Sequence, residues 1–387
     1  MSEEIKKEIQ KSDLDKLDKI RKSLSNILDK KSKFMFAIPD ANNPIASVYE
    51  MYFHATTVKK MGYKVVILVE KGDYEVPKWI EKELTDFEHI SMVDPKLTVG
   101  PEDVMVIPEV FSNVMEQTKN LPCLRVGLLQ SVDYMINALI PGMDWSSFGI
   151  RDIITTSETL VEWLEVFQGK GKFNVQKYDI GIPDYFKKSD LPKKPIISVV
   201  GRNANEISKV VKLFYSKYPQ YSWVTFDPML TKSKPPQQMR RVDFAKRLQS
   251  NFAAVWVDRI ASFGTFPLEC MKVGTVPICL KPDINPDYIV ERDEAGNPIN
   301  LKEGAGVWTD NFYDIPVLVA EILVKFLDDS IGDKAYEEME KTATQYTQEN
   351  SEKRLTEIYQ SYIDARIALF ENALKPFDEA EVKTEEK

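Results

Sequence analysis

The sequence predicts an α/β protein made of two parallel-sheet units, and two observations carry that prediction. Short apolar runs of strand length alternate with longer helical segments, beginning with a strand over 33–38, a helix over 45–61 and a strand over 64–70. Parallel strands connected by crossover helices produce this alternation. The polar stretch 187–195, KKSDLPKKP, then separates two such series, as an interdomain linker does.

The remaining elements follow in chain order. In the first series we expect strands over 89–93, 103–108, 124–130 and 152–157, helices over 110–118 and 158–167, and a closing segment over 178–186. In the second we expect strands over 196–200, 222–226, 253–257 and 304–308 and a helix over 315–327. The expected domains are therefore a helical extension over 1–32, a first domain over 33–186, the linker 187–195, a second domain over 196–345, terminal helices over 346–375 and a flexible tail over 376–387.

The extension over 1–32 carries charges of both signs and a narrow apolar stripe at helical spacing. This pattern predicts one or two amphipathic helices that dock on the body of the protein or on a partner. Homo-oligomer or partner-protein contact is therefore expected through this segment. Mixed charge signs argue against a membrane anchor here.

Composition bounds the class of protein. A length of 387 residues suggests two or three domains, and a net charge of −9 argues against a dedicated nucleic-acid binder. The three cysteines lie in three apolar contexts, which fits buried thiols in a reducing compartment. No apolar run approaches the roughly 18 residues of a spanning helix. We expect a cytoplasmic protein without a transmembrane segment.

The stretch 253–280, AAVWVDRIASFGTFPLECMKVGTVPICL, carries the first functional signal. It has the pattern of a strand, a tight turn, a helix capped by Thr265 and running from 266 to about 273, and a second strand. The start of that helix offers unpaired N–H groups to an anion, and Glu269 lies one turn further on, where its carboxylate can accept hydrogen bonds from a diol. A phosphate and a diol so placed describe a nucleotide diphosphate. The alternative is an ordinary packing unit with a solvated glutamate.

The same stretch resembles the donor-site signature of GT-B-type glycosyltransferases, whose family-4-like members carry E-x-F-G-x-x-x-L-E-A-M-x-x-G-x-P. The matching positions here are Phe263, Gly264, Leu268, Glu269, Met271, Gly274 and Pro277. The chain departs from the family at Ala261, where the first Glu of the Glu-x7-Glu pair is expected. The resemblance implies two Rossmann-like domains facing a cleft, with a C-terminal helix that crosses back to the first domain.

Two further matches occur in the order the family predicts. The segments DIITTSE and YDIGIPDYF, within 152–186, resemble the end of the family's first domain. After the linker, Gly201 and Arg202 match a Gly-Arg pair that holds the donor diphosphate in relatives, with Lys209 the nearest equivalent of the family's lysine. The alternative for Arg202 is a surface arginine at a strand end.

The resemblance assigns residues to each part of a donor site. Arg202 and Lys209 would stabilise the departing diphosphate together with helix N–H groups near Phe263, Gly264, Thr265 and Phe266, and Glu269 would bind the ribose. Asp258, at the end of the strand before the turn, is the nearest substitute for the carboxylate missing at Ala261, and its alternative role is to cap the turn.

The acceptor and sugar side falls on the first domain. Asn42 and Asn43 stand where relatives have glycine, and either contact sugar hydroxyls or close an Asx turn. Gln130 and Asp133 occupy the neighbourhood in which many relatives place a histidine. The basic stretch 232–247 either faces a polyanionic acceptor or, as we favour, forms a solvated helix face.

The sequence hypothesis is a retaining, metal-independent glycosyltransferase that uses a UDP- or GDP-sugar donor and no other cofactor. Its acceptor would be a hydroxyl on a glycan, a protein, a lipid or a modified nucleic-acid base. The chain has no G-x-S-x-G, Walker A or G-x-G-x-x-G motif, which argues against the commonest hydrolase, NTPase and dinucleotide-oxidoreductase classes. With two histidines and no paired Cys/His spacing, a zinc site is not expected. The competing class is a non-catalytic GT-B protein kept as a binding or structural module.

Overall fold

The structure is a computed structural model that describes residues 3–40, 44–230, 239–259, 263–294, 298–302 and 304–385. Within these ranges the side chains of 3–14, 230, 298–300, 333 and 378–385 are not described. The expected residues Asn42, Asn43 and Ala261 and the first part of the basic stretch, residues 232–238, lie outside the described residues.

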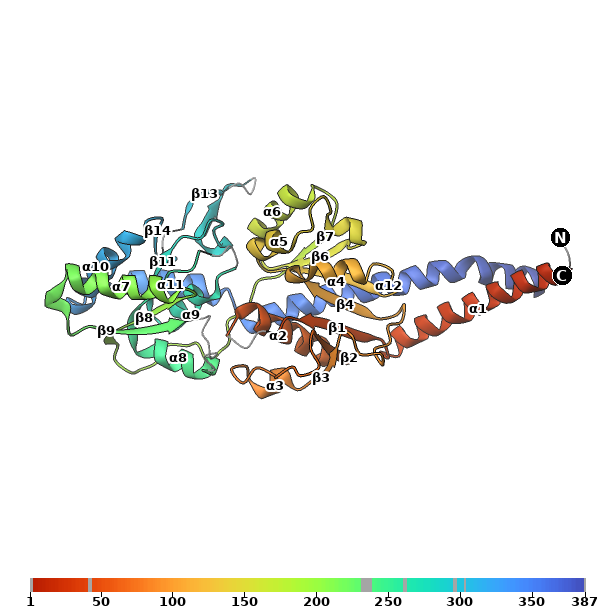
Figure 1. Cartoon of the computed structure of the whole chain (residues 1–387), viewed down its shortest axis with the longest axis horizontal. Coiled ribbons are helices and arrows are strands. Elements are labelled where there is room, and N and C mark those ends of the chain that lie inside the picture. Colours follow the sequence, from red (N-terminus) through yellow and green to blue (C-terminus); the bar gives the residue numbers. More distant parts are fainter. Residues whose placement is uncertain are drawn as a thin grey trace.

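Two parallel sheets form the centres of two lobes (Figure 1). The first has the strand order β3-β2-β1-β4-β5-β6-β7. Its strands are β1 (Lys33–Ile38), β2 (Lys64–Val69), β3 (Glu88–Ser91), β4 (Val104–Pro108), β5 (Leu124–Leu129), β6 (Asp152–Thr155) and β7 (Asn174–Lys177). The order reverses between β1 and β4, which makes the carboxyl ends of these two strands a topological switch point.

Helices cover both faces of the first sheet, and this explains why its central strands, such as β4 and β5, are largely apolar. Along β1, Phe34 and Phe36 join one buried cluster, while Met35 and Ala37 join the cluster on the opposite face. One face packs against α2 (Ala46–Lys60) and α12 (Gln348–Glu385). The other face carries α4 (Ser112–Gln117), α5 (Val132–Ala138) and α6 (Glu158–Gln168). The short elements of this lobe are α3 (Lys82–Thr85), η1 (Glu109–Phe111) and η2 (Trp145–Phe148).

The second sheet has the order β14-β11-β10-β8-β9 and is also parallel. Its strands are β8 (Lys194–Gly201), β9 (Thr225–Leu230), β10 (Asn251–Trp256), β11 (Val276–Leu280) and β14 (Val307–Thr309). Its helices are α7 (Ala204–Lys217), α8 (Arg241–Ser250), α9 (Thr265–Lys272), α10 (Ile315–Leu327) and α11 (Asp333–Thr344), with short turns η3 (Pro219–Tyr221), η4 (Asp287–Ile289) and η5 (Phe312–Asp314). A two-stranded ribbon of β12 (Val290–Arg292) and β13 (Pro298–Leu301) projects from this lobe. The switch point here lies between β8 and β10.

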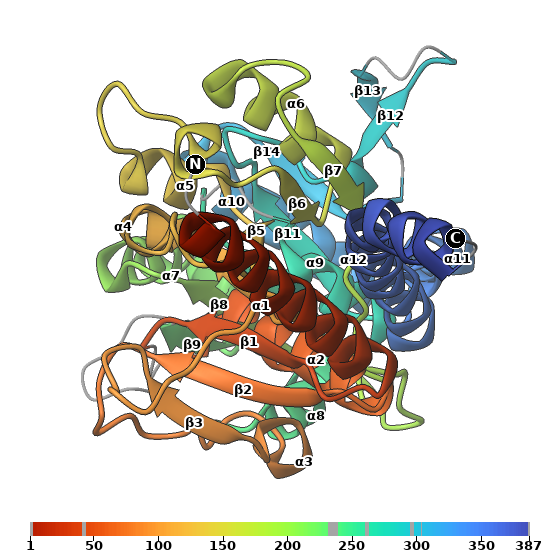
Figure 2. The ribbon, with the colours of Figure 1, turned by 90° about the vertical axis from the view of Figure 1, so that its right-hand side faces the viewer.

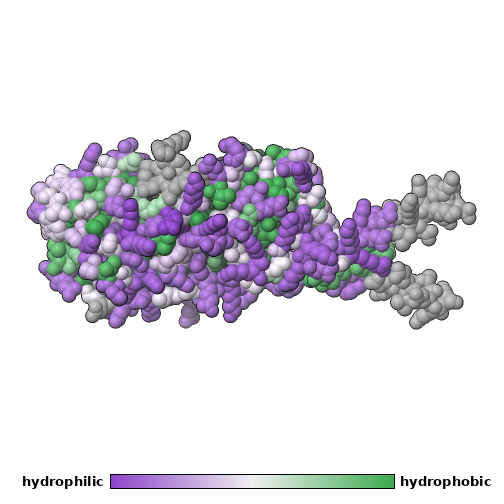
Figure 3. Space-filling view, turned by 90° about the horizontal axis from the view of Figure 1, so that it is seen from below, coloured by the Kyte–Doolittle hydropathy of each residue, from purple (hydrophilic) through white to green (hydrophobic). Residues whose placement is uncertain are grey.

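Two long helices extend from the far end of the first lobe. The N-terminal extension is a single helix, α1 (Glu3–Leu28), and it packs against α12 (Figures 1 and 2). Leu17 and Ile27 on α1 are buried. Seen from below, the body presents a largely hydrophilic face, and the two helices project from one end of it (Figure 3).

The C-terminal helix α12 begins beside the second lobe and runs back across the first, as the sequence predicts. It is fixed there by a buried contact in which Tyr359 Oη lies 2.7 Å from His54 Nδ1 of α2. Burial lowers the pKa of His54 to about 3, so its ring is neutral at physiological pH. The interaction joins the two ends of the chain through the core of the first lobe.

Several element boundaries differ from the sequence prediction. The first domain gains β7 (Asn174–Lys177), a partly polar edge strand that pairs with β6, where we expected regular structure only after 178. β9 starts at Thr225, three positions after the expected 222. The helix α12 continues through Pro376 to Glu385, over the stretch for which the sequence predicts a flexible tail.

The Tyr359–His54 contact gives a stability test with a matched control on the same helix. Tyr359→Phe should lower the free energy of unfolding by about 1–3 kcal/mol, because it leaves a buried imidazole without its hydrogen-bond partner. Tyr362→Phe is the control, since the buried Tyr362 hydroxyl has no partner among the described residues. Urea unfolding of both variants checks this, and equal losses would contradict it.

Candidate functional site

The switch point of the second sheet holds an ion pair. Arg202 follows β8 and Asp258 follows β10, and Arg202 Nε lies 2.7 Å from Asp258 Oδ2. The Arg202 guanidinium also donates a hydrogen bond to the hydroxyl of Tyr134 on α5, with its carbon 5.3 Å from the centre of that ring. Arg202 therefore reaches from the second lobe to the first.

The helix α9 begins beside this pair, at a turn that requires glycine. Gly264 is the N-cap of α9 and has φ +71°, in the left-handed region. A Cβ there would lie 3.0 Å from Trp256 Cη2, and the Gly264 carbonyl accepts a hydrogen bond of 2.6 Å from Tyr288. Thr265 is thus the first helical residue, and the sequence prediction that Thr265 caps the helix is wrong. The N-cap residue, being a glycine, provides no side-chain cap.

Glu269 lies one turn into α9 and is buried, with 5% of its surface exposed. Its Oε1 forms an ion pair with Arg241 Nη2, at the start of α8. Burial raises the pKa of the Glu269 carboxyl, while the Arg241 charge and a hydrogen bond from Thr265 oppose that rise. The carboxylate is therefore held in a low-dielectric site by one strong cationic partner.

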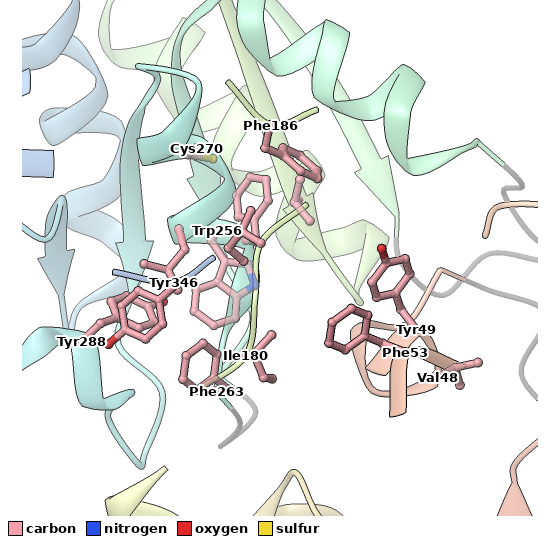
Figure 4. Packing of buried hydrophobic residues seen from close by; sticks show 14 of the residues in the cluster. Val48, Tyr49, Phe53, Ile180, Phe186, Trp256, Phe263, Cys270, Tyr288 and Tyr346 are labelled. Carbon is pink, nitrogen blue, oxygen red and sulfur yellow. The ribbon is translucent and has the colours of Figure 1, made fainter. Parts of the chain in front are cut away.

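Arg241 is itself enclosed by groups from both lobes. Its guanidinium carbon lies 4.1 Å from the centre of the Tyr49 ring on α2 and 5.6 Å from that of Phe186. Its backbone N–H donates to the carbonyl oxygen of Trp79 in the first lobe, at 3.2 Å. Burial alone would lower the pKa of Arg241, but Glu269 raises it, so the side chain stays charged. Figure 4 shows aromatic side chains from the two lobes approaching each other at this boundary.

A second buried carboxyl lies near the same arginine. Glu50 on α2 is 2% exposed and accepts a hydrogen bond of 3.3 Å from the Tyr178 hydroxyl. Burial raises the pKa of Glu50 to about 8, and Arg241 moderates the rise. At neutral pH most of the Glu50 carboxyl is protonated, which spares the cluster a second buried negative charge.

The first lobe contributes the ends of β4 and β5. Gln130, directly after β5, donates a hydrogen bond of 3.3 Å to the backbone oxygen of Ser47. Beneath it, Glu109 directly follows β4 and is 1% exposed. Burial raises the pKa of Glu109 to about 8, and hydrogen bonds from the backbone of Gln130 and Ser131 oppose this shift. Glu109 thus supports the loop that presents Gln130.

These groups surround one cavity of about 220 Å³ between the lobes. Its lining is largely aromatic and aliphatic, with a few convergent polar groups, as ligand pockets usually are. The polar and charged lining side chains are Ser47, Gln130, Tyr134, Arg202, Arg241, Asp258, Thr265 and Glu269.

The cavity brings together most of the residues that the sequence singles out. Arg202, Asp258, Phe263, Gly264, Thr265, Phe266, Glu269 and Gln130 all line it. Gly201 lies at the end of β8 beside Arg202, and Asp133 is half-buried on α5, both outside the lining. Lys209 is exposed on α7 and does not reach the cavity, so the structure does not support its expected place beside Arg202.

Sequence reasoning missed Arg241, Glu50, Glu109 and Tyr134. We favoured a solvated helix face for the basic stretch 232–247, and Arg241 corrects that expectation because it is buried. Its neighbour Arg240 does face solvent, where it pairs with Asp243 at 2.8 Å. Nothing in the local pattern separates the two arginines, because Arg241 is buried by residues of the other lobe.

A separate contact joins the lobes beside the cavity. Asp287 of η4 accepts hydrogen bonds from the backbone N–H groups of Glu158 and Thr159, at 2.6 and 3.1 Å, at the start of α6. Arg292 adds a hydrogen bond of 2.9 Å to the Thr159 hydroxyl and an ion pair of 2.6 Å to Glu162. A carboxylate from one lobe therefore caps a helix of the other.

Neither a protein-family model nor a curated protein matches the sequence. Solved structures do match. The sucrose-phosphate synthase of Thermosynechococcus elongatus aligns with a TM-score of 0.58 over 86% of this chain and 100% of its own, at 12% identity. The chain has the GT-B fold. This confirms the predicted architecture of two parallel-sheet domains facing a cleft.

Two further structures share this fold. The pneumococcal O-GlcNAc transferase GtfA, in complex with UDP and GlcNAc, gives a TM-score of 0.55 over 87% of this chain and 99% of its own, at 8% identity. An alpha-glucosyltransferase in complex with UDP and a 13-mer DNA containing an HMU base gives a TM-score of 0.55 over 86% of this chain and 99% of its own, at 11% identity.

The described residues provide neither a cluster of metal ligands nor a membrane-spanning helix. They contain no group of three or more His, Cys, Asp or Glu side chains placed to hold a metal ion. Among the same residues no helix has both the length and the apolarity to cross a bilayer.

The Asp287 contact predicts a local change in hydrogen exchange. Asp287→Ala should speed exchange of the Glu158 and Thr159 amides, because they lose a charged acceptor worth about 0.5–2 kcal/mol at a helix start. The control is Asp283→Ala, an exposed carboxylate on the same segment. Unchanged protection in Asp287→Ala, measured by exchange with mass spectrometry, would show that the lobes do not meet there in solution.

Proposed function

We propose that this protein is a glycosyltransferase that moves a sugar from a nucleotide-diphosphate sugar to an acceptor hydroxyl. The observation that carries the proposal is the convergence of Arg202, the start of α9 and the buried Glu269 on one cavity between two GT-B lobes. Ligands of open α/β sheets bind at the carboxyl ends of the strands, at a switch point, where Arg202 and Asp258 lie. Two structures of the same fold were solved in complex with UDP, which favours a uridine nucleotide.

Each part of the donor has a proposed partner. The diphosphate lies against Arg202 and the free N–H groups at the start of α9, near Gly264 and Phe266. The ribose hydroxyls donate hydrogen bonds to Glu269, and the aromatic lining encloses the remaining apolar surface. Lys209 has no role in this proposal.

The reaction we propose retains the anomeric configuration and uses no metal. The bond between the sugar C1 and the diphosphate oxygen breaks, giving an oxocarbenium-like transition state, and the acceptor oxygen bonds to C1 on the same face. The acceptor proton passes to the leaving phosphate oxygen. Positive charge on Arg202 and the helix N–H groups stabilise the diphosphate as it departs.

The acceptor binds on the first lobe in this proposal. Gln130 lines the cavity there, and Asn42, Asn43 and Asp133 are proposed as further contacts to the sugar or acceptor. One structure of this fold was solved with a DNA containing an HMU base, and a glycan, protein, lipid or modified-base hydroxyl is proposed as the acceptor. The second-lobe domain over 196–345 is proposed to hold the donor.

A nucleotide screen tests the proposal directly. UDP or a UDP-sugar at about 100 times its dissociation constant should stabilise the protein by about 2.7 kcal/mol, seen as a raised unfolding temperature. GDP-, ADP- and CMP-sugars serve as comparisons. If no nucleotide or nucleotide sugar stabilises the protein, the donor-site proposal fails.

Arg202→Ala should lower turnover by about 10²–10³-fold with a smaller effect on nucleotide affinity, because its charge acts mainly on the departing diphosphate. Release of UDP from a UDP-sugar provides the rate, and calorimetry provides the affinity. The matched control is Lys209→Ala, which removes an exposed cation outside the cavity and should leave both quantities unchanged. Equal losses in the two variants would point to bulk charge rather than to Arg202.

A further inference from the structure

The buried cluster at Glu269 contains more carboxyl groups than cationic groups. Arg241 is buried together with two carboxyls, Glu269 from the same lobe and Glu50 from the other. An isolated ionised carboxyl in such a site would take up a proton rather than remain charged. The state of Glu269 therefore depends on its partner.

Groups from every surrounding element face this carboxylate or its arginine. They are Arg241 on α8, Thr265 and Cys270 on α9, Tyr49 and Glu50 on α2, Tyr185 in the segment between the lobes, and Tyr288 on η4. Burial raises the pKa of Glu50 to about 8 and raises those of the tyrosine and cysteine groups, so these are neutral near pH 7. Arg241 is the cation in this set.

We propose that Arg241 is a positioning residue that keeps Glu269 ionised, so that its carboxylate is ready to accept hydrogen bonds from the ribose diol. This inference rests on the donor site proposed above and adds a residue from outside the donor motif to it. Arg241 acts on the donor through Glu269. An ionised carboxylate can accept hydrogen bonds from both hydroxyls of the diol, whereas a protonated carboxyl is itself a hydrogen-bond donor at one oxygen.

Arginine suits this role better than lysine does. A guanidinium remains charged in a buried site, whereas burial readily neutralises a lysine. Its flat shape also fits the enclosure, since the guanidinium carbon lies 4.1 Å from the centre of the Tyr49 ring. The ion pair is thus held between the α9 carboxylate and an aromatic ring of the opposite lobe.

The first lobe therefore contributes to the charge state of the donor site through Arg241. Tyr49 and the Trp79 carbonyl hold Arg241 in place, and both belong to the first lobe. When the lobes separate, Arg241 loses these contacts, and the affinity of the second lobe for a nucleotide should fall with them.

The test compares nucleotide affinity across pH in Arg241→Gln and in the wild type. Without Arg241 the pKa of Glu269 rises further, so the carboxyl is protonated at low pH and regains its charge as pH increases. We expect Arg241→Gln to bind UDP about tenfold or more weakly at pH 6.5, the deficit shrinking to about threefold at pH 8.5. The affinity of the variant is divided by that of the wild type at each pH, which cancels the effect of the titration of UDP itself.

Further variants identify the titrating group. In Arg241→Gln/Glu269→Gln the pH dependence of the deficit should vanish, because the amide cannot ionise. In Arg241→Gln/Glu50→Gln it should persist. The matched control is Arg240→Gln, an exposed arginine one position away, which should bind UDP as the wild type does at every pH.

Arg241→Lys should recover only part of the affinity, and more of it at pH 6.5 than at pH 8.5, because burial lowers the pKa of a lysine. If the Arg241 variants do not fold, the protonation state of Glu269 is measured by an infrared difference spectrum between the wild type and Glu269→Gln at pH 6.5. An ionised Glu269 contributes no protonated-carboxyl band to that spectrum. Such a band in the wild type, or a deficit in Arg241→Gln that is the same at every pH, overturns the inference. If the wild type itself binds no nucleotide, the proposed function fails first.

Discussion

The buried ion pair between Arg241 and Glu269 is the interaction around which the cavity is arranged. Replacing one partner alone would leave the other uncompensated, at a cost of about 3–5 kcal/mol for a buried charge. The surrounding structure is arranged to avoid that cost. The rings of Tyr49 and Phe186 enclose the guanidinium, Thr265 donates to the carboxylate, and Glu50 holds its proton at neutral pH. The contact between lobes, and not one sheet alone, therefore sets the electrostatics of the site.

The fold was largely predictable because both sheets are covered by helices on both faces. Strands such as β1, after its first residue Lys33, and β11 are then continuously apolar, and their bounds follow from composition. β7 was missed for the converse reason. Asn174–Lys177 is a polar edge strand that owes its conformation to pairing with β6, which local sequence does not record.

The site was predictable where its residues share one local motif. Gly264 and Glu269 belong to a single turn and helix, so their spacing already places them together. Arg241, Glu50 and Glu109 belong to the site only through contacts between lobes or between neighbouring strand ends, so no local pattern marks them. Lys209 matches the expected cation only loosely in sequence, and its exposed side chain lies outside the cavity lining.

Asp258 takes on a different meaning in the structure from the one its sequence position suggests. Because Ala261 stands where relatives have a glutamate, the sequence suggests Asp258 as the substitute for that carboxylate. In the structure Asp258 instead pairs with Arg202, at 2.7 Å. The same guanidinium donates a hydrogen bond to the Tyr134 hydroxyl of the opposite lobe, so two acceptors determine the orientation of the guanidinium plane. A guanidinium has five N–H donors, and these two contacts leave others to face the cavity. Asp258 and Tyr134 thus orient Arg202, and in the proposed reaction a cation held in this way would meet the diphosphate without reorganising. On this reading the carboxylate after β10 serves the donor by directing an arginine.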